Sequence, residues 1–285
     1  MKYSKISVIT PSFNQGEFIE RTVRSVLCQS YPNLEYILMD GGSTDSTLQV
    51  LEAYRSQFAH FVSARDGGQA DAIASGFERS TGEIMTYLNS DDVLAPGTLR
   101  FVSEFFQKNR RIDFIYSHRL AIDESDHVIW YWVLPRHVTY LMRRWDFIPQ
   151  ETCFWRRRLF EKAGNIDRSF YFTMDYDLFV RFMAIGRFRR VDRILAAFRV
   201  HDSSKTSMRL ETVGRKEMQK VWQKHGIPWR SADPAIQQWF VELPPKFGRI
   251  HAASKRFVPG SFPGIGYDFD EVWGGLLRKP GPSRR

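Results

Sequence analysis

The spacing of four apolar segments near the start of the chain constrains the fold most. They are rich in β-branched and aromatic residues and read ISVIT, LEYILMD, HFVSA and EIMTYLN, at residues 6–10, 34–40, 60–64 and 83–89. Each begins roughly 25 residues after the one before, which is enough chain for a strand and a crossover helix. Between them apolar residues recur one helical turn apart, as in Ile19 and Val23 or Ile73 and Phe77. This alternation predicts an α/β fold with a mainly parallel sheet and helices on both faces.

Polar residues follow each of these segments. They are residues 10–12 (TPS), 40–43 (DGGS), 65–66 (RD) and 90–92 (SDD). The carboxyl ends of parallel strands meet at one edge of a sheet, where open α/β sheets bind their ligands. We therefore expect these four groups to form a single site.

Asp91 and Asp92 are adjacent like charges, and a site for a divalent cation is one explanation for them. No G-x-G-x-x-G follows the first segment and no G-x-x-x-x-G-K-[ST] occurs, so the sequence offers no glycine loop of these kinds to cradle phosphates. A hard cation that bridges carboxylates to phosphate oxygens is another way to hold a diphosphate. The alternative is that these residues only turn the chain and cap the next helix.

Beyond residue 110 the regular alternation stops. Two β-type runs, DFIYS and HVIWYWV, flank a polar D-E-S-D turn and predict a hairpin or a mixed extension of the sheet. A helix is expected from near Asp175 to Gly186, then a β-rich run at 188–200 and another helix at 207–225. The expected organisation is one large domain in two halves with an irregular basic and aromatic extension, at residues 1–110, 111–228 and 229–285.

The charge of the chain limits its partners. Lys and Arg outnumber Asp and Glu by 41 to 32, a net charge of +9, which suits nucleic acid, an anionic membrane face or a phosphorylated small molecule. No nucleic-acid-binding module is recognisable, so we expect no nucleic-acid partner. Arginines at 136, 143, 144 and 156–158 lie among aromatic residues and predict a basic, aromatic surface. Such a surface could contact anionic membrane headgroups peripherally, or it could be a merely solvated face.

Two further features indicate the compartment. The apolar run VIWYWVL, at residues 128–134, is far below the roughly 20 residues that span a bilayer. Cys28 and Cys153 are too few for a disulfide framework and lack metal-ligand spacing, so we expect both in the core of a protein kept reduced. The expected location is the cytoplasm, with peripheral contact at the inner face of the cell membrane.

Several stretches taken together are similar to one known family. They read SVITPSFNQGEFIERTVRSVLCQSYPNLEYILMDGGSTDST, DGGQADAIASGFERSTGEIMTYLNSDD, MDYDLFVRF and FRVHDSSKT, in this order. Residues 5 to about 206 resemble the family 2 glycosyltransferases with the GT-A fold. The resemblance implies a Rossmann-like nucleotide-sugar-binding half, 1–110, continued by an acceptor-binding and catalytic half, 111–228. It also implies an inverting enzyme that moves a sugar from a nucleotide sugar, with a UDP-sugar as the expected donor, to a hydroxyl of a glycan or lipid-linked saccharide.

The resemblance also assigns residues to the donor site. The nucleotide sugar is expected to contact Thr10, Pro11, Asp40, Arg65, Asp71, Asp91 and Lys205. Residues 90–92 occupy the family's D-x-D position, which implies a Mn²⁺ or Mg²⁺ ion on Asp92 first, then Asp91, and His201. A lone histidine is more often a surface or hydrogen-bonded residue, and this alternative stays open for His201. The sequence departs from the family's pattern at Ser90, which is not an acid, and at Gly41, where many relatives carry a second acid.

Asp175 lies at the position of the family's catalytic base, although Met174 stands where relatives often have Glu. One base suffices because a metal-neutralised nucleoside diphosphate leaves readily, whereas glycosidases need an acid as well. Aromatic neighbours would raise the pKa of Asp175 and a helix N-terminus would lower it, so the sequence leaves the direction open. Asp177 is expected to be an ordinary first-turn acid. The acceptor is expected to meet Gln150, Glu151 and Trp155, with a core position as an equal alternative for the tryptophan.

Two other functions stay open at this point. A nucleotidyltransferase would share the metal, the nucleotide and a similar α/β architecture, but it would release pyrophosphate. A non-catalytic glycan-binding or assembly subunit would bind saccharide without consuming a donor. The products of the reaction separate all three.

Overall fold

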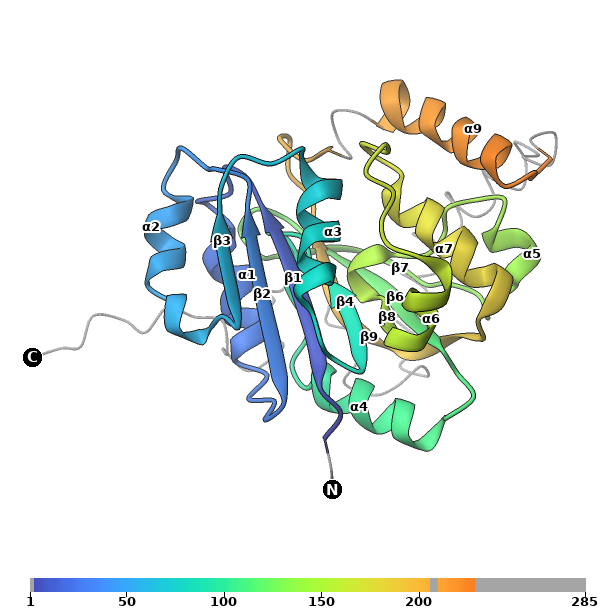
Figure 1. The fold of residues 1–285 in the computed structure, drawn as a ribbon, viewed down its shortest axis with the longest axis horizontal. Coiled ribbons are helices and arrows are strands. Elements are labelled where there is room, and N and C mark those ends of the chain that lie inside the picture. The colour runs from blue at the N-terminus through green and yellow to red at the C-terminus, as the bar shows by residue number, and fades with distance from the viewer. Residues whose placement is uncertain (1–2, 206–209, 229–285) are drawn as a thin grey trace, which may run out of the picture.

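The computed structural model describes residues 3–205 and 210–228 (Figure 1). The expected extension at 229–285 lies outside the described residues. The strands are β1 (Ile6–Ser12), β2 (Leu34–Asp40), β3 (His60–Ser63), β4 (Ile84–Tyr87), β5 (Val93–Leu94), β6 (Phe114–Ile122), β7 (Val128–Trp132), β8 (Phe154–Arg156) and β9 (Phe188–Arg199). The α-helices are α1 (Ile19–Leu27), α2 (Thr47–Glu52), α3 (Gln69–Arg79), α4 (Thr98–Lys108), α5 (Thr139–Met142), α6 (Arg157–Ala163), α7 (Met174–Ile185) and α9 (Arg215–Lys224). Shorter helical turns are η1 (Arg55–Gln57), η2 (Gln150–Thr152) and η3 (Leu210–Gly214).

A single sheet runs through the described part of the chain, in the order β3-β2-β1-β4-β8-β6-β9-β5, with β7 paired to β6. The strands of the first half are parallel, because β1 pairs with β2 and β4, and β2 pairs with β3 (Figure 1). The register sets Ser12 opposite Asp40, so β1 and β2 end level. The predicted α/β fold is confirmed, and the polar residues after these strands share one edge.

Helices cover both faces of this half, because successive strand residues point to opposite sides of the sheet. Ile9 of β1 packs with Ile73 of α3 in one hydrophobic core, and Val8 packs with Val23 of α1 in a second core. Gly76 of α3 lies so close to the sheet that an added Cβ would stand 2.5 Å from Cγ2 of Ile9. Each such buried aliphatic side chain stabilises the fold by about 1.5–3 kcal/mol.

The second half turns the sheet from parallel to mixed. β8 is antiparallel to β4 and to β6, and β6 and β7 form the predicted hairpin. β9 runs parallel to β6 and antiparallel to β5. The strands β5 and β8 have two and three residues, too few to show a period, and the sequence did not predict them.

Two helices of the second half agree with their expected positions, while α5 and α6 were not expected. The helix expected near Asp175 is α7, which ends before Gly186. The helix expected at 207–225 corresponds to η3 and α9, and its first residues, 207–209, lie outside the described part. Among the described helices, none combines the length and the apolar character that crossing a bilayer requires.

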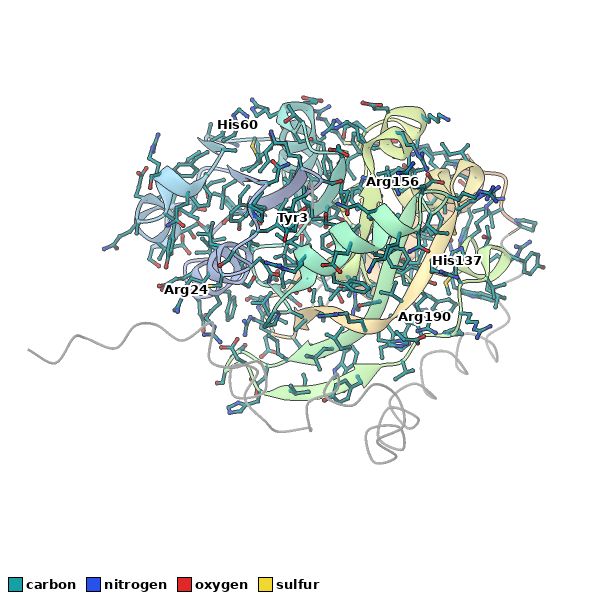
Figure 2. All side chains as sticks on the ribbon, turned by 90° about the horizontal axis from the view of Figure 1, so that it is seen from below. Tyr3, Arg24, His60, His137, Arg156 and Arg190 are labelled. Atoms are coloured by element: carbon teal, nitrogen blue, oxygen red, sulfur yellow. The ribbon has the colours of Figure 1, made fainter. Side chains whose placement is uncertain are left out.

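Two expectations drawn from composition are wrong. Cys28, directly after α1, is exposed, and only Cys153 is buried. The basic, aromatic surface does not form as a unit, because Trp145 and Trp155 lie in the core. Arg156, labelled in Figure 2, donates to the carbonyl oxygens of Phe106 and Ile112 at 2.6 and 2.8 Å, at and beyond the last turn of α4. It therefore caps a helix C-terminus, where a cation is favoured.

Candidate active site

A cavity of about 730 Å³ opens at the carboxyl edge of the parallel strands. One side is formed by the segments that follow β1, β2, β3 and β4, which the sequence predicted to converge. The other side comes from β6, from residues 146–151, from the start of α7 and from residues 203–205. Both halves of the domain therefore contribute to one site.

The expected donor residues divide into those that line the cavity and those that support its walls. Pro11, Arg65, Asp91 and Lys205 line it. Thr10 lies beneath, fully buried, with its hydroxyl 3.2 Å from the Tyr36 hydroxyl. This position leaves Thr10 no surface on the cavity, so a direct contact of its side chain with nucleotide is not what the structure shows.

Asp40 and Asp71 also bind other groups of the protein and do not line the cavity. The Asp40 carboxylate accepts hydrogen bonds from the backbone N–H groups of Gly42 and Ser43, at 3.1 and 3.0 Å, and from the Ser63 hydroxyl at 2.7 Å. It therefore shapes the loop after β2 rather than lining the cavity. Asp71 forms an ion pair with Arg168 at 2.7 Å, also outside the lining. Neither carboxylate lines the cavity, and their contact with a nucleotide stays a prediction.

Two of the three expected metal ligands, Asp91 and His201, are in contact although they lie far apart in the sequence. His201 Nε2 lies 3.0 Å from an Asp91 carboxylate oxygen, and the Asp92 carboxylate accepts from the backbone N–H of Arg199 at 3.0 Å. Thr22 holds this loop by donating to the carbonyl oxygens of Ser90 and Asp92, at 2.9 and 2.7 Å. Asp91 and Asp92 line the cavity, and His201, which does not line it, contacts Asp91 from behind.

Asp92 is 1% exposed, and its charge is poorly compensated. Burial, followed by the charges of Asp91 and Glu151, raises its pKa well above the usual range. A cation would relieve this crowding of negative charge. Within residues 3–205 and 210–228, no three His, Cys, Asp or Glu side chains are grouped so that they could hold a metal by themselves.

Asp175 lines the cavity from the first turn of α7. Its carboxylate accepts the backbone N–H of Tyr176 at 2.8 Å. Burial outweighs this hydrogen bond and raises the pKa of Asp175 to about 6, which settles the direction that the sequence left open.

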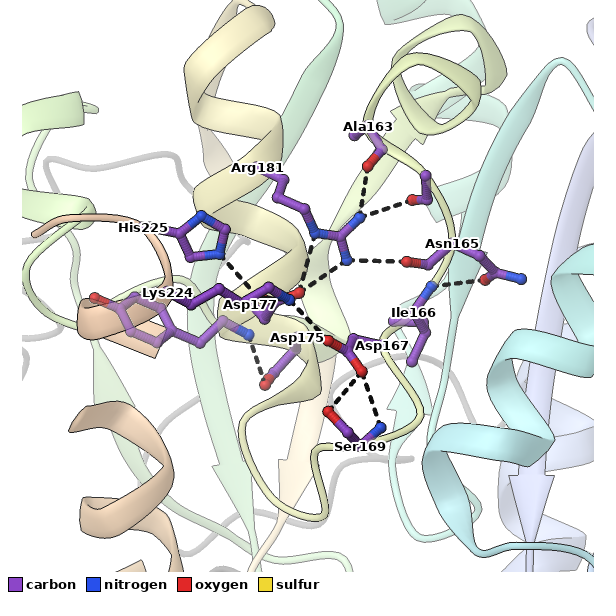
Figure 3. Close-up of polar contacts among 12 residues, drawn as sticks. Ala163, Asn165, Ile166, Asp167, Ser169, Asp175, Asp177, Arg181, Lys224 and His225 are labelled. Carbon is purple, nitrogen blue, oxygen red and sulfur yellow. Dashed lines mark hydrogen bonds and ion pairs between the residues drawn. The ribbon is translucent and has the colours of Figure 1, made fainter. Parts of the chain in front are cut away.

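Asp177 has a different place, although it is only two residues further on. It does not line the cavity, and it binds Arg181 at 2.9 Å, Lys224 at 2.8 Å and His225 at 2.9 Å (Figure 3). These bonds join α7 to the end of α9. Asp177 is therefore a structural residue, held by ion pairs rather than by the helix dipole alone.

Gln150 and Glu151 of η2, which were expected to meet the acceptor, line the cavity. Glu151 forms a two-pronged ion pair with Arg119 of β6, at 2.9 and 2.8 Å. Gln150 donates to the carbonyl oxygen of Tyr87 at 2.8 Å. Trp155 does not reach the cavity: it is fully buried and stacks on Phe114. The acceptor contact expected for Trp155 is wrong, and the alternative core position is what the structure shows.

The sequence analysis missed two charged residues of this wall, Arg119 and Asp146. Burial and the charge of Asp175 raise the pKa of Asp146 well above its usual range. Asp146 stands among aromatic residues without a motif, so no sequence signal would have found it. Arg119 sits in a β-type run, where only its pairing with Glu151 reveals its role.

Lys205 closes the cavity near the start of α7. Its ammonium donates to the side-chain oxygen of Gln69 at 2.7 Å and to the carbonyl oxygen of Tyr171 at 3.1 Å. Burial lowers the pKa of Lys205 to about 8. A partly desolvated cation at this place suits an anionic group in the cavity.

Comparison with known proteins identifies the family. The family model described as Glycosyl transferase family 2 matches residues 7–167, more than half of the chain. The chain belongs to glycosyltransferase family 2. The expected enzyme class is therefore confirmed, and the matched region includes the carboxylates after β4 but ends before Asp175.

Two curated relatives illustrate the range of this family. An uncharacterized glycosyltransferase of Rickettsia typhi is 27% identical over 227 residues, which cover 76% of this chain and 70% of the relative. Chondroitin synthase of Escherichia coli is 25% identical over 198 residues, 66% of this chain but only 28% of the synthase.

Solved structures agree on the fold. Staphylococcus aureus TarS 1–349, in complex with UDP-GlcNAc, superposes with a TM-score of 0.63 at 17% identity, over 96% of this chain and 82% of that one. The mannosyltransferase PcManGT from Pyrobaculum calidifontis, in complex with GDP-Man and Mn²⁺, gives a TM-score of 0.59 at 16% identity, over 91% and 78%. The GT-A-type architecture expected from the sequence is confirmed by these glycosyltransferase folds.

Proposed function

We propose that this glycosyltransferase is a metal-dependent, inverting enzyme that transfers one sugar from a nucleotide diphosphate sugar to a hydroxyl group. The observation that carries the proposal is one cavity with two kinds of carboxylate. Asp91 and Asp92 line it from the loop after β4, the proposed donor side, and Asp175 lines it from the start of α7. Residues 1–110 would then hold the donor, and residues 111–228 would supply the base and the acceptor surface.

The donor side fits a nucleotide diphosphate sugar, with a UDP-sugar as our first candidate. Pro11 and Arg65 line the same cavity as Asp91 and Lys205, so a base or ribose and a diphosphate find apolar and cationic surfaces together. One TarS structure contains UDP and another contains UDP-GlcNAc, and PcManGT contains GDP-Man. These complexes support the donor class, and the choice of base is part of the proposal.

Asp92, Asp91 and His201 are the residues that would hold a Mn²⁺ or Mg²⁺ ion. Hard carboxylate oxygens suit either cation, and a buried Asp92 with a raised pKa is a site that positive charge would stabilise. When bound, the ion supplies charge neutralisation for the diphosphate leaving group. The PcManGT complex contains Mn²⁺, which supports this choice of cofactor.

Asp175 is the proposed general base. Its carboxylate takes the proton of the acceptor hydroxyl while that oxygen attacks the anomeric carbon, and the bond from this carbon to the nucleoside diphosphate breaks. Direct displacement inverts the anomeric centre. A pKa of about 6 is suitable, because a general base works best when its pKa is near the operating pH.

The acceptor is proposed to be a glycan or a lipid-linked saccharide. Gln150 and Glu151 present amide and carboxylate groups to the acceptor side, and Trp132 adds an aromatic surface there. Sugar rings stack on such faces and bond to such groups. We place the enzyme in the cytoplasm, with peripheral contact to an anionic membrane where the acceptor is lipid-linked.

The test is thermal stability of the full chain with UDP, GDP or CDP, each with and without Mn²⁺. A ligand that binds only the folded state raises the melting temperature. We expect a rise with one nucleotide, UDP first, that needs Mn²⁺ and is lost in Asp92→Asn. Glu104→Gln, which removes one acid on the exposed face of α4, is the control and should behave as wild type. A metal-independent rise would contradict the metal site, and no rise with any nucleotide would contradict the donor site.

Analysis of the products completes the test. A glycosyltransferase releases a nucleoside diphosphate and a glycoside of inverted configuration, while a nucleotidyltransferase releases pyrophosphate. Consumption of donor with release of UDP, GDP or CDP supports the proposal. Retention of the anomeric configuration would exclude direct displacement.

A further inference from the structure

A second concave site lies on the side of the domain away from the catalytic cavity. It is a groove of about 400 Å³ between the end of α4, the helix α6 and the end of α7. Five cationic side chains and one carboxylate line it: Arg110, Arg111, Arg158, Lys162, Arg187 and Asp113. We call it the basic groove.

The basic groove is separate from the catalytic cavity, since the two share no lining residue. The helix α7 connects them: Asp175, in its first turn, lines the cavity, and Ile185, its last residue, lines the groove. Ten residues of α-helix correspond to about 15 Å. The groove is therefore a separate site from the one proposed to hold the donor diphosphate.

The charge of the groove is only partly balanced within the protein. Asp113 pairs with Arg158 at 2.6 Å, and its other oxygen accepts the backbone N–H of Arg187 at 3.0 Å. Both oxygens of the single carboxylate are therefore in use. In the part of the chain that the structure describes, no acidic side chain forms an ion pair with Arg110, Arg111 or Lys162, nor with the Arg187 guanidinium.

Four like charges that face one concave space repel one another, so this arrangement does not stabilise the fold. The floor adds to the effect, because Leu159 is 3% exposed and a low-dielectric wall focuses the electric field. Guanidinium groups present donors in a fork that matches the oxygens of a phosphate group. Concave shape, uncompensated charge and this geometry together indicate an anion ligand.

We propose that the basic groove binds the phosphate groups of an anionic ligand, at a site independent of the donor. The volume is larger than a single phosphate needs and falls in the range of small-molecule sites. Two sources share this chemistry: the headgroups of an anionic phospholipid surface and a soluble polyphosphate. Ile185, which is 53% exposed at the rim, gives an apolar contact that a lipid surface would use and a soluble ion would not.

The test compares two double variants of the full chain. Arg110→Gln with Arg111→Gln removes two exposed charges of the groove, neither of which lines the catalytic cavity. Arg55→Gln with Arg79→Gln removes the same charge from exposed positions in η1 and α3. One arm measures co-sedimentation with phosphatidylcholine vesicles that contain or lack phosphatidylglycerol. The other arm measures the thermal shift with sodium tripolyphosphate in the presence of saturating UDP and Mn²⁺.

We expect the wild type and the control to bind in at least one arm, and the groove variant to bind about 30-fold more weakly there. Higher salt should weaken this binding, since exposed charges are screened. The UDP and Mn²⁺ shift should be equal in all three proteins, so failure here is distinct from failure at the donor site. Binding in neither arm would overturn the proposal, and so would an equal loss in both variants.

Discussion

Two buried carboxylates at opposite ends of the same sheet are treated differently by this protein. Glu35, at the amino end of β2, accepts from the Ser7 hydroxyl and from the backbone N–H and hydroxyl of Thr81, all at 2.6 Å, and pairs with Lys5 at 2.6 Å. Burial alone would raise its pKa, but these bonds together lower the pKa of Glu35 to about 2. Asp175, at the carboxyl end, has a pKa raised to about 6 because burial outweighs its backbone hydrogen bonds.

Glu35 is a buried charge with enough partners to stabilise the fold, whereas Asp175 is a buried charge with few partners. A buried charge with enough partners favours the native state, whereas one with few partners costs free energy. The cavity holds three carboxylates of the second kind, since Asp92 and Asp146 also have raised pKa values. Buried charges that lower the stability of the fold are typical of functional sites, where activity is gained at the expense of stability.

The largest effect is expected for a change at Asp175, the carboxylate whose pKa is raised. Asp175→Asn keeps the shape of the side chain but removes the proposed base, so turnover should fall by roughly 10³-fold. Donor binding, measured as the thermal shift with nucleotide and Mn²⁺, should remain, because Asp175 is not among the residues proposed to hold the donor. Undiminished turnover would show that another group, with Asp146 as the first candidate, takes the proton.

The second prediction concerns Glu35, the carboxylate whose pKa is lowered. Glu35→Gln removes a charge that Lys5 and Thr81 stabilise, and it should lower the free energy of unfolding at pH 7 by on the order of 2 kcal/mol. Because the folded pKa is depressed, this contribution is present above about pH 4.3 and is lost as the pH falls toward 2. Urea unfolding of both proteins at pH 7 and pH 3 measures it. A difference that stays constant with pH would contradict the ionic account, and donor binding should be unchanged.

The third prediction concerns the pH dependence of stability at Asp175, which has the opposite sign to that at Glu35. The folded pKa of Asp175 is raised, so its ionisation costs stability as the pH rises from about 4 to about 6 and the full cost remains above that. Asp175→Asn should therefore be more stable than wild type at pH 8, by up to about 2 kcal/mol, and equal to it at pH 4. Melting curves at the two pH values test this. A variant that is less stable at pH 8 would show that the carboxylate is better solvated than its burial implies.

The parallel half and the mixed half of the sheet also differ in how well the sequence predicts them. The parallel half follows from local patterns, because alternating strands and helices carry their own periodicity and fix which polar loops converge. Asp91 and Asp92 could be named as metal-ligand candidates because they stand at the family's D-x-D position, and His201 because it resembles a separate C-terminal element of the family. Asp91 and Asp92 line the cavity and His201 contacts Asp91, while the metal site itself stays a prediction.

Tertiary packing decides the residues that sequence reasoning missed. Asp146 enters the cavity because the chain from β7 to β8 folds over the mixed part of the sheet, and no local pattern encodes that path. Trp155 looks like a sugar-stacking residue by composition, yet β8 inserts between β4 and β6 and buries it. Cys28 was expected inside, but the end of α1 leaves it exposed.

The smallest effect is expected at Glu217, a second buried carboxylate that, like Glu35, accepts several hydrogen bonds. Glu217 of α9 is buried and accepts the backbone N–H groups of Tyr171, Phe172 and Thr173, at 2.9, 2.7 and 3.0 Å. These residues lead directly into α7, so Glu217 positions the segment that carries Asp175. Glu217→Gln replaces one accepting oxygen by an amide donor that faces these N–H groups, which should cost about 1–2 kcal/mol of stability.

The kinetic effect distinguishes positioning from stability alone. Misplacement of the segment before α7 should reduce turnover several-fold, with donor affinity and the position of the pH profile unchanged, because the base itself is intact. Lys216→Gln, a change at the neighbouring exposed position of α9, is the control and should leave both quantities as in wild type. If Glu217→Gln lost stability but kept full turnover, its carboxylate would belong with Glu35 as a purely structural charge, and its bonds to residues 171–173 would have no part in aligning Asp175.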